Sequence, residues 1–96
     1  MLTYKAAYRT IPEGYFAEAL DFPGVVTWGR DLDEARRMLA SALADMAETN
    51  LILGEPLPIP DPNVGDPSAD VEEPIHLLLT AASRVTVAPM PAGAAP

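Results

Sequence analysis

The feature that most constrains this chain is a proline-rich stretch in its second half. Six of the eleven prolines in the 96-residue sequence fall between residues 56 and 74. Proline has no backbone N–H and a fixed φ, so it is excluded from helix interiors and from central strands. The pattern predicts that residues 55–73 form an irregular connection laid over the surface. The fold must therefore be built from the segments on either side of it.

Length and composition indicate one small domain. We expect the domain to span residues 1–88, with the proline-rich acidic connection at 55–74 inside it and a disordered tail at 89–96. A hydrophobic fraction of 49% excludes a chain that is disordered overall. No apolar run reaches the roughly 18 residues of a membrane span, and the first nine residues lack the apolar core of a signal peptide. With no cysteine, disulfides and thiolate sites are excluded. We predict a cytoplasmic protein that binds no membrane.

Negative charge is concentrated in one part of the chain. The formal net charge is −8, and residues 38–83 contain eight acids and no base. Phosphate groups would be repelled by such a block, which argues against direct DNA binding by this chain. The block suits a partner that is itself basic. The alternative is a solvated acidic face that keeps a small protein soluble.

Hydrophobic periodicity predicts three strands followed by a helix. Apolar residues alternate from Leu2 to Tyr8, which indicates a strand with one buried face. Tyr15–Leu20 and Val25–Trp28 are predicted to follow as strands, separated by turns at Pro12–Gly14 and Asp21–Gly24.

The helix is predicted to begin after Asp31 and to end at Gly54, a length of about 22 residues. Asp31 can cap it, with Glu34 completing an acidic variant of the capping box. A stripe at helical spacing is expected to pack on the sheet, and its members are Ala35, Leu39, Ala42, Leu43, Met46 and Leu53.

Beyond the connection, Ile75–Leu79 and Arg84–Val87 are predicted strands, although a helix through Leu77–Ala82 also fits the pattern. The element order is β-β-β-α-β-β. The expected fold class is α+β, a mainly antiparallel sheet with one long helix packed on one face.

The residues for catalysis are largely missing. His76 is the only histidine, and it lies in a predicted strand, where a packed or edge histidine is the expected role. Four acids near the start of the helix could approach one another and hold a hard cation: Asp21, Asp31, Asp33 and Glu34. Capping already explains Asp31 and Glu34. We predict no catalytic residue, no metal and no cofactor, and hence a protein that is not an enzyme.

One series of short motifs is more specific than the rest. Glu13-Gly14-Tyr15-Phe16-Ala17 is followed by Asp21-Phe22-Pro23-Gly24-Val25-Val26-Thr27-Trp28-Gly29, then by Leu32-Asp33-Glu34-Ala35 and by the proline-rich run after Gly54. In order and spacing these resemble the HicB family, the antitoxin halves of type II toxin–antitoxin pairs, over about residues 2–60. The positions that carry the resemblance, with structural roles, are Gly14, Tyr15, Pro23, Gly24, Thr27, Gly29, Glu34 and Ala35. The resemblance implies a partial RNase H-like fold without the nuclease's catalytic set.

The resemblance also implies a partner. HicB proteins bind HicA toxins, which are small basic ribonucleases, and cover the toxin's catalytic histidine and RNA-binding surface. An acidic chain is physically suited to that role. The residues that we expect to bind the partner are Trp28, Asp45, Glu48, Glu55 and Asp61. Trp28, beside Gly29 at a strand end, would lie either at an interface or over the core.

Many HicB proteins carry a C-terminal helix-turn-helix or ribbon-helix-helix that binds the operator. No such segment fits here, because a single base follows residue 37 and the last residues are proline, alanine and glycine. Two alternatives to the antitoxin hypothesis stay open. One is a stand-alone structural or regulatory dimer with an unknown partner. The other is a residual RNase H-like hydrolase that uses Asp21, Asp31 or Glu34. A homodimer is expected in either binding role, because the core of so short a chain is thin.

Overall fold

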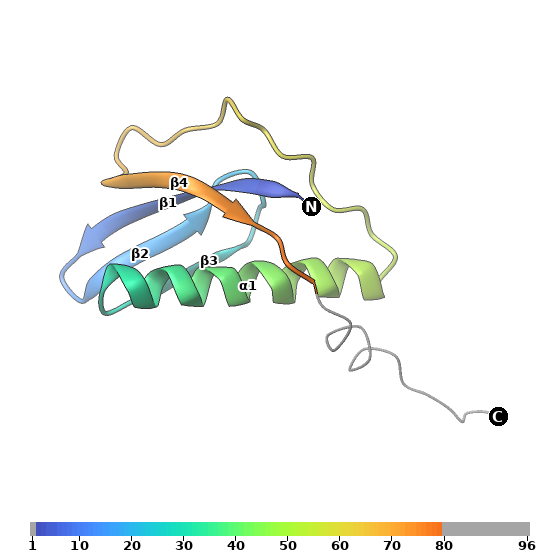
Figure 1. Cartoon of the computed structure of the whole chain (residues 1–96), viewed down its shortest axis with the longest axis horizontal. Helices are drawn as coiled ribbons and strands as arrows, with labels where there is room; N and C mark the ends of the chain where they lie inside the picture. The colour runs from blue at the N-terminus through green and yellow to red at the C-terminus, as the bar shows by residue number, and fades with distance from the viewer. Residues whose placement is uncertain (1, 80–96) are drawn as a thin grey trace, which may run out of the picture.

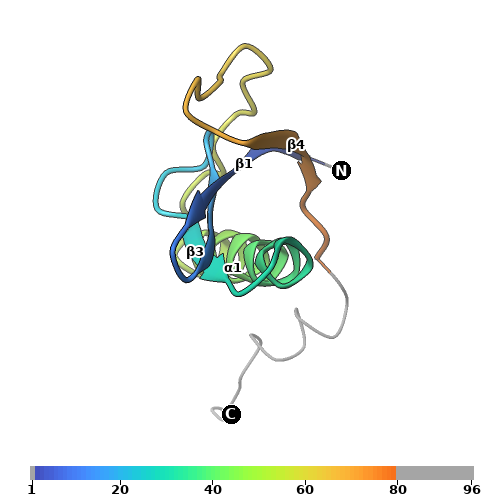
Figure 2. The ribbon, with the colours of Figure 1, turned by 90° about the vertical axis from the view of Figure 1, so that its left-hand side faces the viewer.

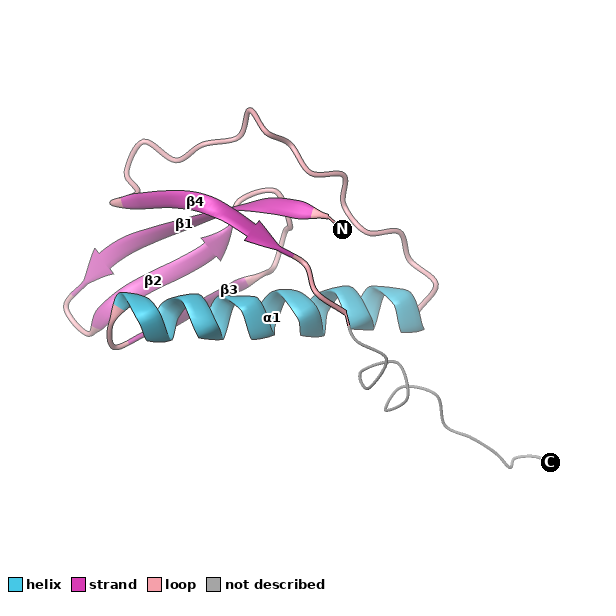
Figure 3. Ribbon diagram, viewed as in Figure 1, coloured by secondary structure: helices cyan, strands magenta, loops and turns pink. Residues whose placement is uncertain are grey.

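The computed structural model describes residues 2–79, which form four strands and one helix. The order is β1 (Thr3–Ile11), β2 (Gly14–Ala19), β3 (Val26–Gly29), α1 (Leu32–Ile52) and β4 (Val71–His76). The strands form one antiparallel sheet in the order β3-β2-β1-β4 (Figures 1 and 3). The predicted α+β class and the three N-terminal strands are confirmed. The predicted strand at Arg84–Val87 and the predicted tail lie outside the described residues.

Helix α1 lies in the concave face of the sheet, which curls around it (Figure 2). The strand residues that face α1 include Tyr4, Ala6 and Tyr8 on β1 and Ala17 and Ala19 on β2, all buried. Small alanines in the middle of this face let the helix approach closely, while the larger rings fill the margins. Tyr4 packs on Phe22 with ring centroids 5.2 Å apart.

The helix begins as the capping pattern predicts, with one difference. The Asp31 Oδ1 atom accepts a 2.8 Å hydrogen bond from the Glu34 N–H. The Glu34 carboxylate, however, accepts its backbone hydrogen bond from the N–H of Arg30, at 2.7 Å, rather than from that of Asp31. The same carboxylate holds the Arg30 guanidinium, at 3.1 and 3.2 Å. The Asp31 carboxylate and the Glu34 carboxylate therefore each bond to a backbone N–H of the β3–α1 turn or the first turn of α1, and together they fix this turn.

Gly14, Gly29 and Ala35 meet where β2, β3 and α1 come together. A Cβ atom added to Gly29 would overlap the backbone N of Ala35 and lie 2.8 Å from its Cα. One added to Gly14, whose φ is +147°, would overlap the Gly29 carbonyl oxygen. Gly29 does not have a positive φ, so it is required for the close approach of α1 and not for its backbone conformation.

The strand after the connection was placed wrongly. It was predicted at Ile75–Leu79, with residues up to 73 irregular, but β4 spans Val71–His76, and 77–79 have no regular structure. Pro74 hid this strand. The Leu77 N–H donates to Leu2 O, and hydrogen-bonded and non-hydrogen-bonded pairs alternate along an antiparallel ladder. The Lys5–Pro74 pair is therefore a non-hydrogen-bonded pair, and the backbone nitrogen of Pro74 faces the open edge of the sheet. Pro74 therefore costs no ladder hydrogen bond. The described part of the alternative helix through Leu77–Ala82 is not helical.

The helix itself matches its predicted length, with Leu53 as C-cap and Gly54 at φ +72°. The predicted stripe is correct for Ala35, Leu39 and Leu43, which are fully buried, and it missed Ala47. It is wrong for Leu53, which is 64% exposed. Twenty-one helical residues span about 31 Å. Figure 1 shows that the last turns of α1 extend beyond the strands, so no sheet covers this end. No helix among residues 2–79 is long and apolar enough to cross a membrane.

We predict that Gly29→Ala destabilises the protein by about 1–3 kcal/mol, because the added methyl group must push α1 away from β3. Gly65→Ala is the matched control, since its Cβ atom would find only the Glu72 carboxylate at 3.7 Å, an ordinary contact. Urea unfolding measures both. Equal midpoints for Gly29→Ala and the wild type would contradict the close-approach account.

Candidate protein-binding surface

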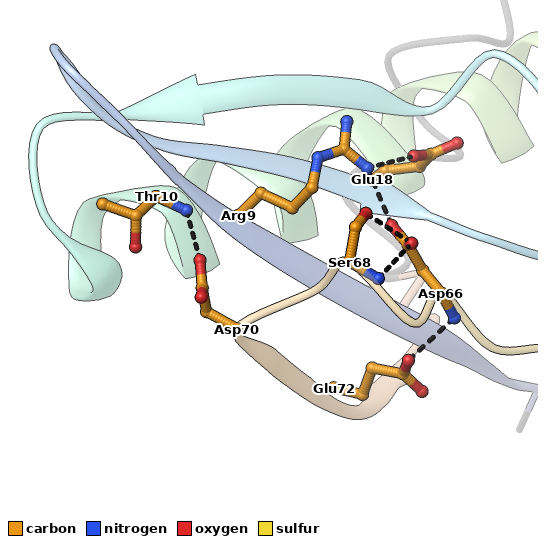
Figure 4. A network of polar contacts seen from close by, with 7 residues as sticks. All are labelled: Arg9, Thr10, Glu18, Asp66, Ser68, Asp70 and Glu72. Carbon is orange, nitrogen blue, oxygen red and sulfur yellow. Dashed lines mark hydrogen bonds and ion pairs between the residues drawn. The ribbon is translucent and has the colours of Figure 1, made fainter.

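The acidic stretch divides into acids that hold the fold together and acids that do not. Figure 4 shows the first group, on the face of the sheet opposite α1. The Arg9 guanidinium on β1 lies 2.7 Å from Asp66 Oδ2 and 3.9 Å from Glu18. Asp66 also accepts from the N–H and hydroxyl of Ser68, while its own N–H donates to Glu72. These contacts fasten the connection to β1 and β2.

Further acids of the stretch are used in the same way. Asp70 accepts a hydrogen bond from the Thr10 N–H, and Glu73 forms a two-point pair with Arg36 of α1, at 2.9 Å each. Hydrogen bonds from Ser68 lower the pKa of Asp66, with Arg9 contributing less, and the Thr10 N–H lowers the pKa of Asp70. The pKa of the Tyr8 hydroxyl is raised to about 12. Burial is the largest cause, and the negative charge of Glu73 and its hydrogen bond with Tyr8 add to the effect. The connection is thus an ordered part of the domain.

The second group consists of the four acids that sequence reasoning selected. Among residues 2–79, no salt bridge involves Asp45, Glu48, Glu55 or Asp61. Asp45 and Glu48 lie one turn apart on α1, and Glu55 follows its end, whereas Asp61 lies in the connection and accepts from the Asn63 N–H.

The end of α1 combines this charge with apolar surface. Leu51, Ile52 and Leu53 are 48–64% exposed there. No base lies in the last turn to balance the partial negative charge of the helix C-terminus. We call this region, which comprises residues 45–52 of α1, its C-cap Leu53 and the two residues after it, the α1 overhang. It offers a negative potential around an apolar centre, which is the composition of a protein-binding surface for a cationic partner.

Trp28 does not join this surface. It lies on β3, at one edge of the sheet, with its side chain 50% exposed on the face opposite α1. Of the two roles expected for Trp28, covering the core does not fit, because the core lies on the other face. The structure therefore separates Trp28 from Asp45 and Glu48, which the sequence had grouped as one binding set.

The acids of the hydrolase alternative are held in structural bonds. Asp21 accepts from the N–H of Lys5 through one oxygen and from that of Asp61 through the other, both at 2.9 Å. Asp31 and Glu34 are occupied at the helix start, as described above. Within the described part of the chain, no three histidine, aspartate or glutamate side chains are close enough to hold a metal ion. This arrangement gives the hydrolase hypothesis no support.

Two other features fit structural roles. His76 lies exposed on the edge strand β4, as expected, and its Nδ1 is 2.9 Å from the Thr3 hydroxyl. An open hollow of about 390 Å³ is lined by leucines alone: Leu2, Leu57, Leu77, Leu78 and Leu79. Its lining offers no polar side chain to orient a small ligand.

Comparison with solved structures identifies the fold. The N-terminal domain of the Burkholderia pseudomallei antitoxin HicB superposes with a TM-score of 0.64 and 24% identity, over 81% of this chain and all of that one. The longer HicB structure from the same organism gives 0.65 and 22%, over 86% of this chain and 67% of that one. The chain therefore has a HicB-like fold. No protein-family model matches the sequence, and no curated protein matches it.

Acid should destabilise the protein through the carboxylates named above. Hydrogen bonds from Arg30 lower the pKa of Glu34 to about 2, and the pKa values of Asp66 and Asp70 are lowered too. A lowered native pKa stabilises the fold above the unfolded value of about 4, and this stabilisation is lost as pH falls toward the native value. We expect the urea midpoint to fall between about pH 5 and about pH 2.

Glu34→Gln should lower stability at neutral pH and flatten this acid limb. Glu13→Gln is the control, because Glu13 is exposed and makes no salt bridge among the described residues. The control should keep the wild-type pH profile. If the Glu34→Gln variant shows the same acid limb as the wild type, the proposed role of Glu34 at the helix start is wrong.

Proposed function

We propose that the protein is an antitoxin of the HicB type, which binds a small basic HicA-type ribonuclease and masks its RNA-binding and catalytic surface. The observation that carries the proposal is the HicB-like fold, which covers the whole N-terminal domain of the Burkholderia antitoxin HicB. The motifs from Gly14 to Ala35 add to it, because Gly14, Gly29 and Ala35 meet at the junction of β2, β3 and α1.

The α1 overhang is the surface proposed to meet the toxin. A ribonuclease presents lysine and arginine side chains where it binds the phosphates of RNA. Asp45, Glu48 and Glu55 would face these basic side chains. Exposed ion pairs contribute only about 0–1 kcal/mol each. Charge therefore governs the rate of encounter and the orientation, whereas affinity must come mainly from burying Leu51, Ile52 and their neighbours.

Co-expression is the direct test of the proposal. The reading frame adjacent to the one that encodes this chain is induced alone and then together with it. We expect growth arrest, rescue by this chain, and co-purification of a stable complex. Arrest without rescue and without a complex would contradict the proposal, as would the absence of any arrest.

Charge reversal tests the surface. We expect Glu48→Lys to weaken toxin binding about fivefold, which corresponds to loss of about 1 kcal/mol from an exposed contact. Glu13→Lys makes the same change of net charge at the β1–β2 turn, which lies at the opposite end of the molecule from the α1 overhang (Figure 1), and should bind as the wild type does. Stopped-flow association measures both variants.

Association of the wild type with the toxin should also slow when salt rises from about 0.05 to about 0.5 M, because the screening length falls to about 4 Å. An association rate that is indifferent to salt, with Glu48→Lys and Glu13→Lys equally affected, would place the contact elsewhere on the chain.

A further inference from the structure

The two edges of the sheet differ in how open they are to another strand. The outer edge of β4 carries Glu72, Pro74 and His76, and charges and proline are the means by which proteins block an edge. β3 is Val26-Thr27-Trp28-Gly29, with no charge and no proline. Among the described strands only β2 pairs with it. The β3 edge is therefore an unprotected template for strand pairing.

The register determines which groups this edge offers. The Ala19 N–H donates to Val25 O, and hydrogen-bonded pairs alternate along an antiparallel ladder. Thr27 and Gly29 are then bonded to β2, while the N–H and C=O groups of Val26 and Trp28 face outward. The hydrogen bond from the Leu20 N–H to Lys5 O gives a consistent result for the other side of β2. By the same alternation, Glu18 and Phe16 bond to β1, which leaves Ala17 and Tyr15 to bond to β3. Two donors and two acceptors are thus presented in a row.

The same two residues present apolar side chains beside those groups. Val26 is 49% and Trp28 50% exposed on the face opposite α1. Trp28 is the cross-strand partner of Phe16, and the Arg9 guanidinium lies 4.7 Å from the centre of the Phe16 ring. The connection covers the β1 half of this face through Arg9 and Lys5, but β3 lies outside it.

Charge indicates what can occupy this edge. Two copies of a chain with net charge −8 repel one another wherever their acids meet. The β3 edge itself is uncharged, and Glu18 of β2, which pairs with Val26, lies 3.9 Å from the Arg9 guanidinium. Two copies can therefore meet along β3 without bringing acids of this strand together. The edge also fits itself, because it offers donors and acceptors in equal number around Thr27.

We propose that two copies of the chain pair through β3, antiparallel, about a two-fold axis at Thr27. Val26 of each copy lies opposite Trp28 of the other, and each such pair exchanges two backbone hydrogen bonds. The two sheets become one of eight described strands. On the face opposite α1, each Trp28 ring packs on Val26 of the second copy, an aromatic and β-branched pair. This interface is separate from the α1 overhang, so the proposal does not depend on the antitoxin function.

Hydrogen exchange and light scattering together test this interface on the full chain. At concentrations where light scattering gives a dimer, the Val26 and Trp28 amides should be protected, and on dilution to the monomer they should exchange fast. The Thr27 amide, bonded to β2, should stay protected in both states. Trp28 is the only tryptophan of the sequence, so its fluorescence should shift to shorter wavelength as the dimer forms. Higher salt should favour the dimer, the opposite of its effect on binding a basic toxin.

Variants locate the contact. Trp28→Glu and Val26→Glu should each give monomers with a native circular dichroism spectrum. Ile59→Glu makes the same kind of change at a side chain 88% exposed in the connection, and it should dimerise as the wild type does. A wild-type chain that is monomeric at every concentration overturns the proposal and leaves the edge open to a strand from another protein. A dimer in which the Val26 and Trp28 amides exchange fast overturns it too, even if a variant fails to fold.

Discussion

The contact between Ala35 and Gly29 is the constraint on which the rest of the structure depends. Backbone meets backbone there, and no side chain larger than hydrogen fits at Gly29. This contact fixes the height of α1 above the sheet, so that only alanines fit beneath it in the middle of β1 and β2. Tyr4, Tyr8 and Phe22 then fill the space at the margins where sheet and helix diverge. The backbone of Gly14 in turn packs against the carbonyl oxygen of Gly29, so the β1–β2 hairpin is held at the same place.

The acids of the chain fall into two groups according to what their side chains contact. Asp66, Asp70, Glu72 and Glu73 fasten the connection and β4 to the sheet and to α1. Their partners on β1 and α1, which are Lys5, Arg9, Thr10 and Arg36, lie far away in the sequence, so each of these contacts closes a long loop. Asp45, Glu48 and Glu55 have no such role among the described residues. The same residue type thus holds the fold in one half of the stretch and gives a surface its potential in the other.

The two surfaces of the molecule differ in physical character and in position. The α1 overhang is acidic with an apolar centre, and attraction to a cationic partner across it weakens with salt. The β3 edge is uncharged, and association of two acidic copies there is opposed by repulsion that salt relieves. Since one lies beyond the strands and the other at the far edge of the sheet, a dimer formed through β3 keeps both α1 overhangs available for partners.

Local patterns in the sequence determined the hairpin, the third strand, the helix and its caps, because alternation, helical periodicity and capping depend on neighbours within a few residues. They also selected Asp45, Glu48, Glu55 and Asp61 as acids for a partner, and these four form no salt bridge among residues 2–79. Tertiary structure decided the rest. β4 was misplaced because a proline is harmless only when its missing N–H faces a free edge, and the edge is a property of the whole sheet. Leu53 is exposed because α1 extends beyond the strands. Trp28 is separated from Asp45 and Glu48 because its side chain lies on the face of the sheet opposite α1. Which face of the sheet the helix covers, and where the sheet ends, are properties of the packed structure that no spacing in the sequence records.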